Sequence, residues 1–343
     1  MATTNLIRPN SNFANTSPLP TDMLLPVFGG EVLAAFEEYN QFLGMVNTKT
    51  ITSGREMKFP ATWKIGSEYH EAGTELLGLD VETKEYVITL DDRPLVSHFE
   101  VDDIDMALSH WEVRGELASQ TGQELARQLD RKLAILLLLA ARTGADSGTN
   151  SFPIGGNTYY GAQAEFDETN WGLEQNALQL IEAIGKINEE MDKKDVPHMG
   201  RQCVVNVPLF YALRKLGLPH WPGAKANLEI QSLWGRPDTG SAGPRIQDSR
   251  TYGQAIDVLG TPVYMSNHVP DVNITTGPAK YRGDFSKTGG VMFQRDAIGA
   301  LQLLGVTTEN FRDVRRQSDF MVAKIMTGGG TLRPYCAYEI AGT

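Results

Sequence analysis

The sequence predicts an α+β protein, because helical and strand-like patterns occupy different parts of the chain. The strongest helical pattern covers residues 103–142, where leucines recur at or near multiples of four. Period-two stretches rich in Val, Ile, Thr and Tyr fill much of residues 50–100 and return in residues 291–340. The predicted order is an arm, a hairpin, a long helix, a mixed α/β middle and a β-rich end.

Composition excludes several classes of protein. The 343 residues are 41% hydrophobic, enough for a core and for about two domains. With 31 Lys and Arg against 42 Asp and Glu, the net charge is −11, and no cationic run marks a nucleic-acid-binding face.

Met1–Pro20 lacks the apolar stretch of a signal peptide, and the longest apolar run, Leu133–Ala141, is about half of a membrane span. The distant Cys203 and Cys336 are expected to be buried and unpaired, which fits a reducing cytoplasm.

The N-terminal hundred residues favour an arm followed by a hairpin. Turn formers dominate residues 1–27, and residues 28–36 carry the apolar stripe of a short helix. Residues 51–60 and 84–91 alternate like two strands, and the charged stretch 63–82 between them has no long apolar run. Because an isolated hairpin is marginally stable in water, we expect this one to need support from another chain.

The long helix is predicted over residues 103–142. Acidic residues at its start suit the helix dipole, whereas Gly115 and Gly122 are weak points without being stops. The acidic residues are Asp102, Asp103 and Asp105. The residues expected in the core are Leu125, Leu129, Leu133 and Leu137.

The rest of the chain predicts shorter elements. A second helix is expected over 173–191, a third over 208–216, and strands over 203–207, 258–267, 291–293, 299–306, 319–326 and 335–340. The predicted apolar face of the second helix comprises Leu178, Ile181, Ile184 and Ile187. Gly328–Gly330 is interpreted as a turn at strand ends.

No motif of enzyme chemistry stands out. The six histidines are far apart, and neither HExxH nor Cys-x-x-Cys spacing is present. The acids at 102–105 lack the continuation of an EF-hand, residues 239–243 lack the first glycine of a hydrolase elbow, and no phosphate-binding loop is present. No catalytic, cofactor-binding or metal-ligating residue is therefore predicted. A soluble hydrolase with dispersed carboxylates remains an alternative.

Several segments, in order along the chain, resemble one family. Residues 27–33 (VFGGEVL) and 101–114 (VDDIDMALSHWEVR) are similar to the major capsid proteins of T7-like, short-tailed bacteriophages. So are residues 259–263 (LGTPV), 320–324 (FMVAK) and 330–334 (GTLRP). Each segment alone is loosely defined, but their shared order is fairly specific.

The resemblance implies the HK97-type phage capsid fold. It implies an N-terminal arm over residues 1–45, an extended loop over 46–100, and an axial domain over 149–261. The peripheral domain then combines residues 101–148, which hold the spine helix, with residues 262–343.

The resemblance also implies a structural role rather than an enzymatic one, with no cofactor. Such proteins assemble as hexamers and pentamers into an icosahedral shell around double-stranded DNA, with extended loops lying over neighbouring subunits. The implied partners are further copies of the chain, a scaffolding protein and a portal, while a decoration protein is left open. The implied location is the virion capsid, assembled in the bacterial cytoplasm. An encapsulin-type compartment would keep the fold and change the contents.

Charged residues of the extended loop are the predicted contacts between subunits. No motif assigns a covalent crosslink to Lys58, Lys64 or Lys84, which lie in the same region. The predicted contact residues are Glu56, Lys58, Lys64, Glu68, Glu71 and Glu75.

Overall fold

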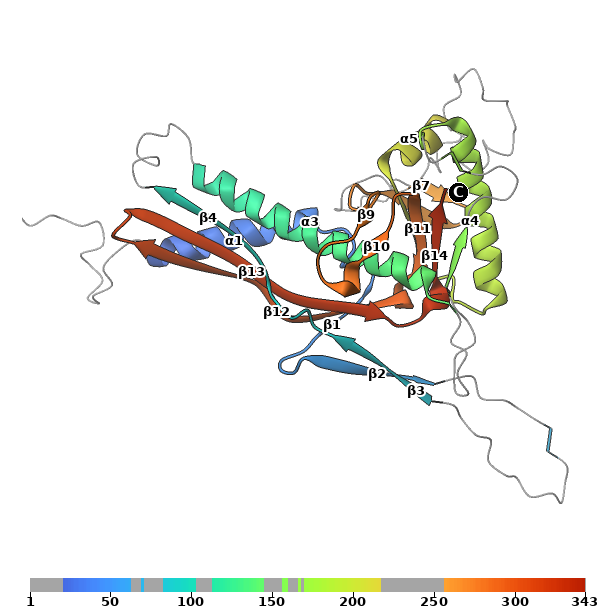
Figure 1. Ribbon diagram of the computed structural model, residues 1–343, viewed down its shortest axis with the longest axis horizontal. Helices are drawn as coiled ribbons and strands as arrows, with labels where there is room; N and C mark the ends of the chain where they lie inside the picture. Colours follow the sequence, from blue (N-terminus) through green and yellow to red (C-terminus); the bar gives the residue numbers. More distant parts are fainter. Residues whose placement is uncertain are drawn as a thin grey trace, which may run out of the picture.

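The computed structural model describes residues 21–62, 69–70, 83–102, 113–144, 156–159, 166–167, 170–216 and 256–342. The molecule is elongated, with a long helix and a long hairpin running side by side along its main axis (Figure 1). A mixed sheet with two flanking helices lies at one end, and a separate two-stranded hairpin extends from one side.

The described residues form four helices and several sheets, in agreement with an α+β fold. The helices are α1 (Thr21–Tyr39), α3 (Val113–Arg142), α4 (Glu174–Lys193) and α5 (Val207–Leu216). The first strands are β1 (Asn47–Thr50), β2 (Glu56–Thr62), β3 (Thr83–Thr89), β4 (Leu95–Asp102), β5 (Asn157–Tyr159) and β6 (Arg201–Val205). The later ones are β7 (Ile256–Val258), β8 (Thr261–Met265), β9 (Asn273–Ile274), β10 (Gly283–Asp284), β11 (Thr288–Gln294), β12 (Ile298–Asp313), β13 (Ser318–Thr331) and β14 (Ala337–Ala341). Short 3-10 turns are η1 (Ala279–Tyr281), η2 (Arg295–Ala297) and η3 (Pro334–Cys336).

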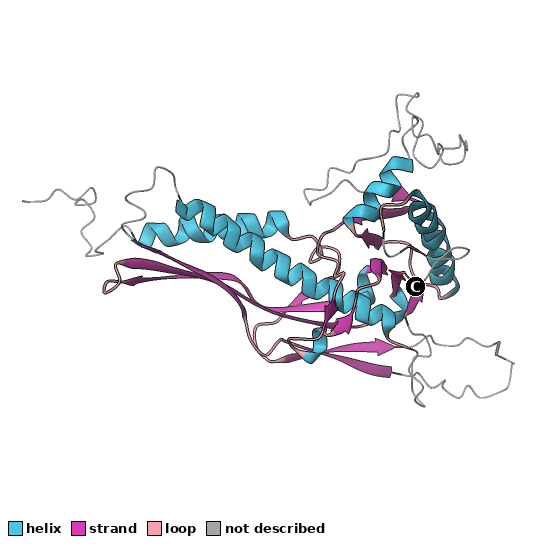
Figure 2. Ribbon diagram, turned by 45° about the horizontal axis from the view of Figure 1, so that its top comes forward, coloured by secondary structure: helices cyan, strands magenta, loops and turns pink. Residues whose placement is uncertain are grey.

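Two sheets make the body. One has the order β1-β12-β13-β4, and α1 and α3 cover one of its faces (Figure 2). The other has the order β5-β14-β11-β6-β8-β7, with α4 and α5 beside it. Since a single apolar cluster runs from α1 through α3 into both sheets, the body folds around one continuous core.

Helix α3 confirms the predicted spine helix over the residues that the structure describes. Leu125, Leu129, Leu133 and Leu137 are all buried, as their spacing predicts. Residues 103–112 lie outside the described part. The prediction that Asp102 opens the helix is wrong, because Asp102 ends β4, where it pairs with Ser318 of β13.

Helix α1 is longer than the sequence analysis predicts. Residues 21–27, expected to be part of an irregular arm, belong to it. The helix packs closely on α3 at Gly122, where a Cβ atom would lie 2.4 Å from the carbonyl oxygen of Val32 and 2.9 Å from the Cβ of Ala35. Glycine at position 122 therefore lets the two helices approach closely. The stability gained from this packing outweighs the low helix propensity of glycine.

The interpretation of Gly328–Gly330 as a turn is wrong, since all three glycines lie inside β13. A Cβ atom on Gly328 would lie 2.5 Å from the Cα of Leu90, which forms an isolated bridge with that glycine. Glycine is required at position 328 because another backbone crosses directly over the strand there, whereas a Cβ on Gly329 would meet the side chain of Leu136 at 2.6 Å.

Helices α4 and α5 confirm the second and third predicted helices, but the apolar face of α4 is only partly as expected. Ile184 and Ile187 are buried, whereas Leu178 is 46% exposed. Smaller side chains, Ala177 and Ala183, lie in the core in its place. The β-rich end confirms the predicted strands, with wider bounds for β11, β12 and β13, whereas the last strand begins only at Ala337 because η3 occupies Pro334–Cys336. Both cysteines are buried and free.

Candidate assembly interface

The β2–β3 hairpin has two unlike faces. Its strands pair antiparallel, with Lys58 opposite Val87 and Phe59 opposite Tyr86. Because neighbouring residues of a strand point to opposite faces, Phe59 and Ile88 turn toward the body and are buried there. They join Leu90, Leu301 and Leu332 in a small apolar cluster separate from the main core. The base of the hairpin is thus supported by its own chain, and the expected support from another chain stays a prediction.

The other face of the hairpin is open. The Lys58 ammonium donates to the Glu85 carboxylate at 2.9 Å, and the two side chains are 60% and 61% exposed. This hydrogen bond raises the pKa of Lys58. Val87, opposite Lys58 in the register, is 48% exposed. An exposed valine flanked by charged residues on a projecting strand pair is a surface suited to contact with another protein.

The predicted contact residues fall into two groups. Glu56 and Lys58 lie in β2, where both are exposed. Lys64, Glu68, Glu71 and Glu75 lie outside the described residues. Within the described part, the structure does not gather the predicted residues into one cluster, because Lys58 pairs with Glu85 rather than with a member of the predicted set.

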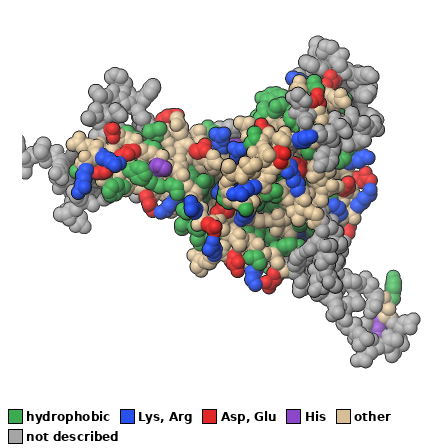
Figure 3. Space-filling model, viewed as in Figure 1, with side chains coloured by type: hydrophobic (Ala, Val, Ile, Leu, Met, Phe, Trp, Pro, Cys, Tyr) green, Lys and Arg blue, Asp and Glu red, His purple; other side chains and the backbone are tan. Residues whose placement is uncertain are grey.

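A second exposed region was not predicted from the sequence. At the tip of the β12–β13 hairpin, Phe311 is 66% exposed and Val314 is 77% exposed. In the space-filling view, apolar, basic and acidic side chains alternate over this arm of the molecule (Figure 3). The sequence did contain a signal for this region. Phe311 is an aromatic residue among polar ones, in the part of β12 that extends beyond the buried half of the strand.

Buried charges hold the segments of the body together. Asp130 of α3 is fully buried and accepts from the backbone N–H groups of Gln41 and Phe42 at 2.8 and 3.1 Å. The Nδ1 atom of His268 lies 3.1 Å from the same carboxylate. These contacts join the end of α1, the middle of α3 and the loop after β8.

The joint between α3 and the second sheet has an ion pair whose carboxylate is buried. Arg142, in the last turn of α3, donates to both carboxylate oxygens of Glu339 in β14 at 2.5 and 2.6 Å. The hydroxyl of Thr288 donates to the same carboxylate at 2.7 Å. Such satisfied buried charges fix the orientation of the packed elements, because breaking one would leave a buried charge unpaired.

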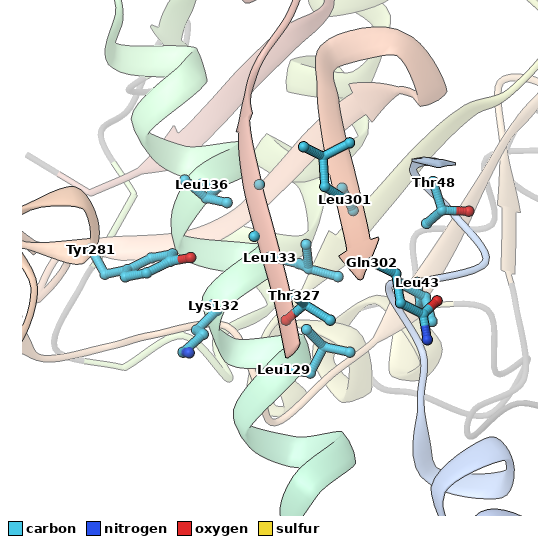
Figure 4. A pocket seen from close by; sticks show the side chains of 13 residues that line it. Leu43, Thr48, Leu129, Lys132, Leu133, Leu136, Tyr281, Leu301, Gln302 and Thr327 are labelled. Carbon is cyan, nitrogen blue, oxygen red and sulfur yellow. The ribbon is translucent and has the colours of Figure 1, made fainter. Parts of the chain in front are cut away.

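The cavities do not suggest catalysis. A cavity between α3 and the β1-β12-β13 strands measures about 10 Å3, room for about one water molecule, and Lys132 and Tyr281 lie at the end away from Thr48 (Figure 4). An open groove of about 700 Å3 lies among α1, α3 and α5 and is lined by amide and tyrosine side chains together with Glu124, Arg127 and His268. No group of three metal-ligating side chains gathers within the described ranges. Among the helices described, none is long and apolar enough to cross a membrane.

A body with one continuous core, a projecting hairpin and an exposed second tip offers two surfaces for contact with other proteins. The chain belongs to the Gp10A-like major capsid protein family, whose profile matches residues 58–341. The chain is therefore a bacteriophage major capsid protein.

Individual relatives agree with this family. The major capsid protein of Escherichia phage T7 is 28% identical over 320 residues, which cover 92% of this chain and 90% of the relative. The capsid structure of the cyanophage P-SCSP1u is 25% identical with a TM-score of 0.68, covering 89% of this chain and 88% of the other. A virus-like particle from Pyrococcus furiosus has a TM-score of 0.51 at 10% identity, covering 92% of this chain and 99% of the other, and so shares the fold alone.

Proposed function

We propose that the chain assembles as hexamers and pentamers into a closed icosahedral shell around double-stranded DNA, and that the outer face of β2–β3 contacts a neighbouring subunit. The observation that carries this proposal is the hairpin itself, which buries one face on its own body and leaves Lys58, Glu85 and Val87 exposed on the other. The predicted residues Glu56, Lys64, Glu68, Glu71 and Glu75 belong to the same proposed contact.

The proposed domain organisation follows the two parts of the body. Residues 101–148 and 262–343 would form a peripheral domain around α3, and residues 149–261 an axial domain that meets its copies around each capsomer axis. Residues 1–45 would serve as the arm, although α1 makes the second half of that segment part of the body. The proposed partners are a scaffolding protein and a portal, with assembly in the bacterial cytoplasm.

The role is assembly without turnover. Membership in a structural family supports this part of the proposal. An encapsulin-type compartment is less well supported, because the family match is to phage capsid proteins.

Sedimentation of the full chain, expressed alone and with its candidate scaffolding protein, tests the proposal when followed by electron microscopy of the fast fraction. Uniform closed shells are expected, and packaged DNA rather than an enzyme would distinguish a virion from a compartment. A small stable species under every condition would contradict the proposal.

A further inference from the structure

The chain leaves the β2–β3 hairpin through Asp91, whose carboxylate is held by three side chains of the body. Its Oδ2 accepts from the Nζ of Lys132 on α3 at 2.9 Å. Its Oδ1 accepts from the hydroxyl of Tyr281 at 2.8 Å, and the Nζ of Lys280 lies 3.7 Å away. The backbone N–H of Asp91 donates to the carbonyl of Thr327 in β13 at 3.2 Å. One residue at the hairpin's base therefore contacts α3, η1 and β13 at once.

The same contacts reach the end of β3 itself. Lys280 also donates to the carbonyl oxygen of Thr89 at 3.0 Å, and Leu90 bridges to Gly328. The absence of a side chain on Gly328 lets the two backbones approach, so the end of the hairpin lies directly on β13 at this point. The apolar cluster beneath the hairpin adds burial, which is not directional. Hydrogen bonds to a carboxylate are directional, and the Asp91 cluster supplies them.

Asp91 compensates the positive charges of two lysines in the cluster. Two lysines from different elements converge on one carboxylate, and both are about three-quarters buried. Burial lowers the pKa of Lys280, whereas Asp91 raises it. Without the carboxylate, the two ammonium groups would face each other in a partly buried place and repel.

We propose that the Asp91 cluster is the positioning device that fixes the direction in which the β2–β3 hairpin leaves the body, and thereby the direction in which it meets a neighbouring subunit. The second half of this inference rests on the proposed function. Asp91, Lys132, Lys280 and Tyr281 are thus positioning residues for assembly, acting through the hairpin rather than by touching the neighbour.

The test compares Asp91→Asn with Asp92→Asn in the full chain, co-expressed with the candidate scaffolding protein. Asp92 is the matched control, because it is the next residue and its side chain is 77% exposed and paired with the similarly exposed Arg55. Lys132→Met is the second variant, since it removes a charge from the body side and leaves the hairpin sequence unchanged. Asp91→Glu, which keeps the charge, should restore assembly in part.

Two readouts separate positioning from general stability. Amide hydrogen exchange in residues 83–90 should accelerate by about tenfold or more in Asp91→Asn and Lys132→Met, because each loses a charge-assisted bond. Exchange in residues 133–141 of α3 should stay at the parental rate. Electron microscopy should show open shells or mixed diameters for these two variants, and uniform shells for Asp92→Asn.

Two results would overturn the inference. One is uniform shells of parental diameter from Lys132→Met or Asp91→Asn, with unchanged exchange in residues 83–90. The other is equal acceleration in 133–141, which would make the cluster a general stabiliser. If the parent chain itself forms no shells, the proposed function fails, and the exchange comparison still decides whether Asp91 positions the hairpin.

Discussion

The body and the β2–β3 hairpin bury their apolar residues in different ways. Helix α3 is surrounded by α1 and by strands of both sheets, so its leucines lie in one continuous core. The hairpin has one strand pair, buries only its inner face in a small separate cluster, and exposes Val87 on the other. The body thus buries its apolar residues within one chain, whereas we propose that the hairpin is completed by contact between chains.

Replacing Leu133 by Ala should have the largest effect on folding. The side chain is buried in the middle of α3, and its removal should lower the free energy of unfolding by about 2–5 kcal/mol. Urea denaturation of the unassembled subunit measures the loss. The control is Leu178→Ala at an exposed position of α4, which should change stability by less than about 0.5 kcal/mol. Equal losses in both variants would break the distinction between core and surface.

Replacing Gly122 by Ala should have the next largest effect. The new Cβ would meet the backbone of α1 at 2.4 Å, so the two helices must separate, at a cost of about 1–3 kcal/mol. Gly30→Ala is the matched control, because a Cβ there meets nothing within 4 Å. That variant should stabilise the protein by about 0.5–1 kcal/mol through helix propensity. The close packing of α1 on α3 is contradicted if both substitutions shift the thermal midpoint in the same direction.

A substitution on the outer face of the hairpin should lower the yield of shells rather than the stability of the subunit. Val87→Asp should change subunit stability by less than about 1 kcal/mol, since the side chain is half exposed, while sharply lowering the yield of shells. Val272→Asp, at a similarly exposed valine outside the hairpin, is the control. Parallel urea titration and sedimentation separate the two effects. Similar shell yields from the two variants would remove the special role of the hairpin.

The two buried cysteines should not react in the native subunit, which tests whether the core of the body stays closed. Burial raises the pKa of Cys203 to about 12, and mainly burial raises that of Cys336 to about 12. A raised thiol pKa keeps the group protonated and unreactive from pH 6 to about pH 9. Ellman's reagent should therefore detect no fast-reacting thiol in the native subunit and two in denaturant. A fast native thiol would mean that the core of the body opens readily.

Local patterns predicted most of the fold. The spacing of Leu125 to Leu137 is a property of one helix, and the two strands of the hairpin alternate within themselves, so both were predictable. Asp102 was assigned to a helix start because the strand that pairs with β4 comes more than two hundred residues later. Gly328 was interpreted as a turn because nothing near it in sequence shows that Leu90 crosses it. The missing information was non-local packing in each case.

The candidate interface was predicted less completely. Lys58 and Glu56 were identified from charge, but Glu85, the partner of Lys58, and the exposed Val87 depend on strand register, which the sequence leaves open until the turn is known. The tip residues Phe311 and Val314 were missed because they fall between the predicted strands 299–306 and 319–326, whereas β12 extends to Asp313. Asp91 and Asp130 gave no signal apart from being acids, since their partners lie far away in sequence.

A cryo-electron microscopy reconstruction of the assembled shell tests the central claim most directly. The account predicts that the outer face of β2–β3, with Lys58 and Val87, is covered by a neighbouring subunit while Phe59 and Ile88 stay packed on their own body. A shell in which that outer face remains in solvent, with the subunits joined only through other surfaces, would contradict it.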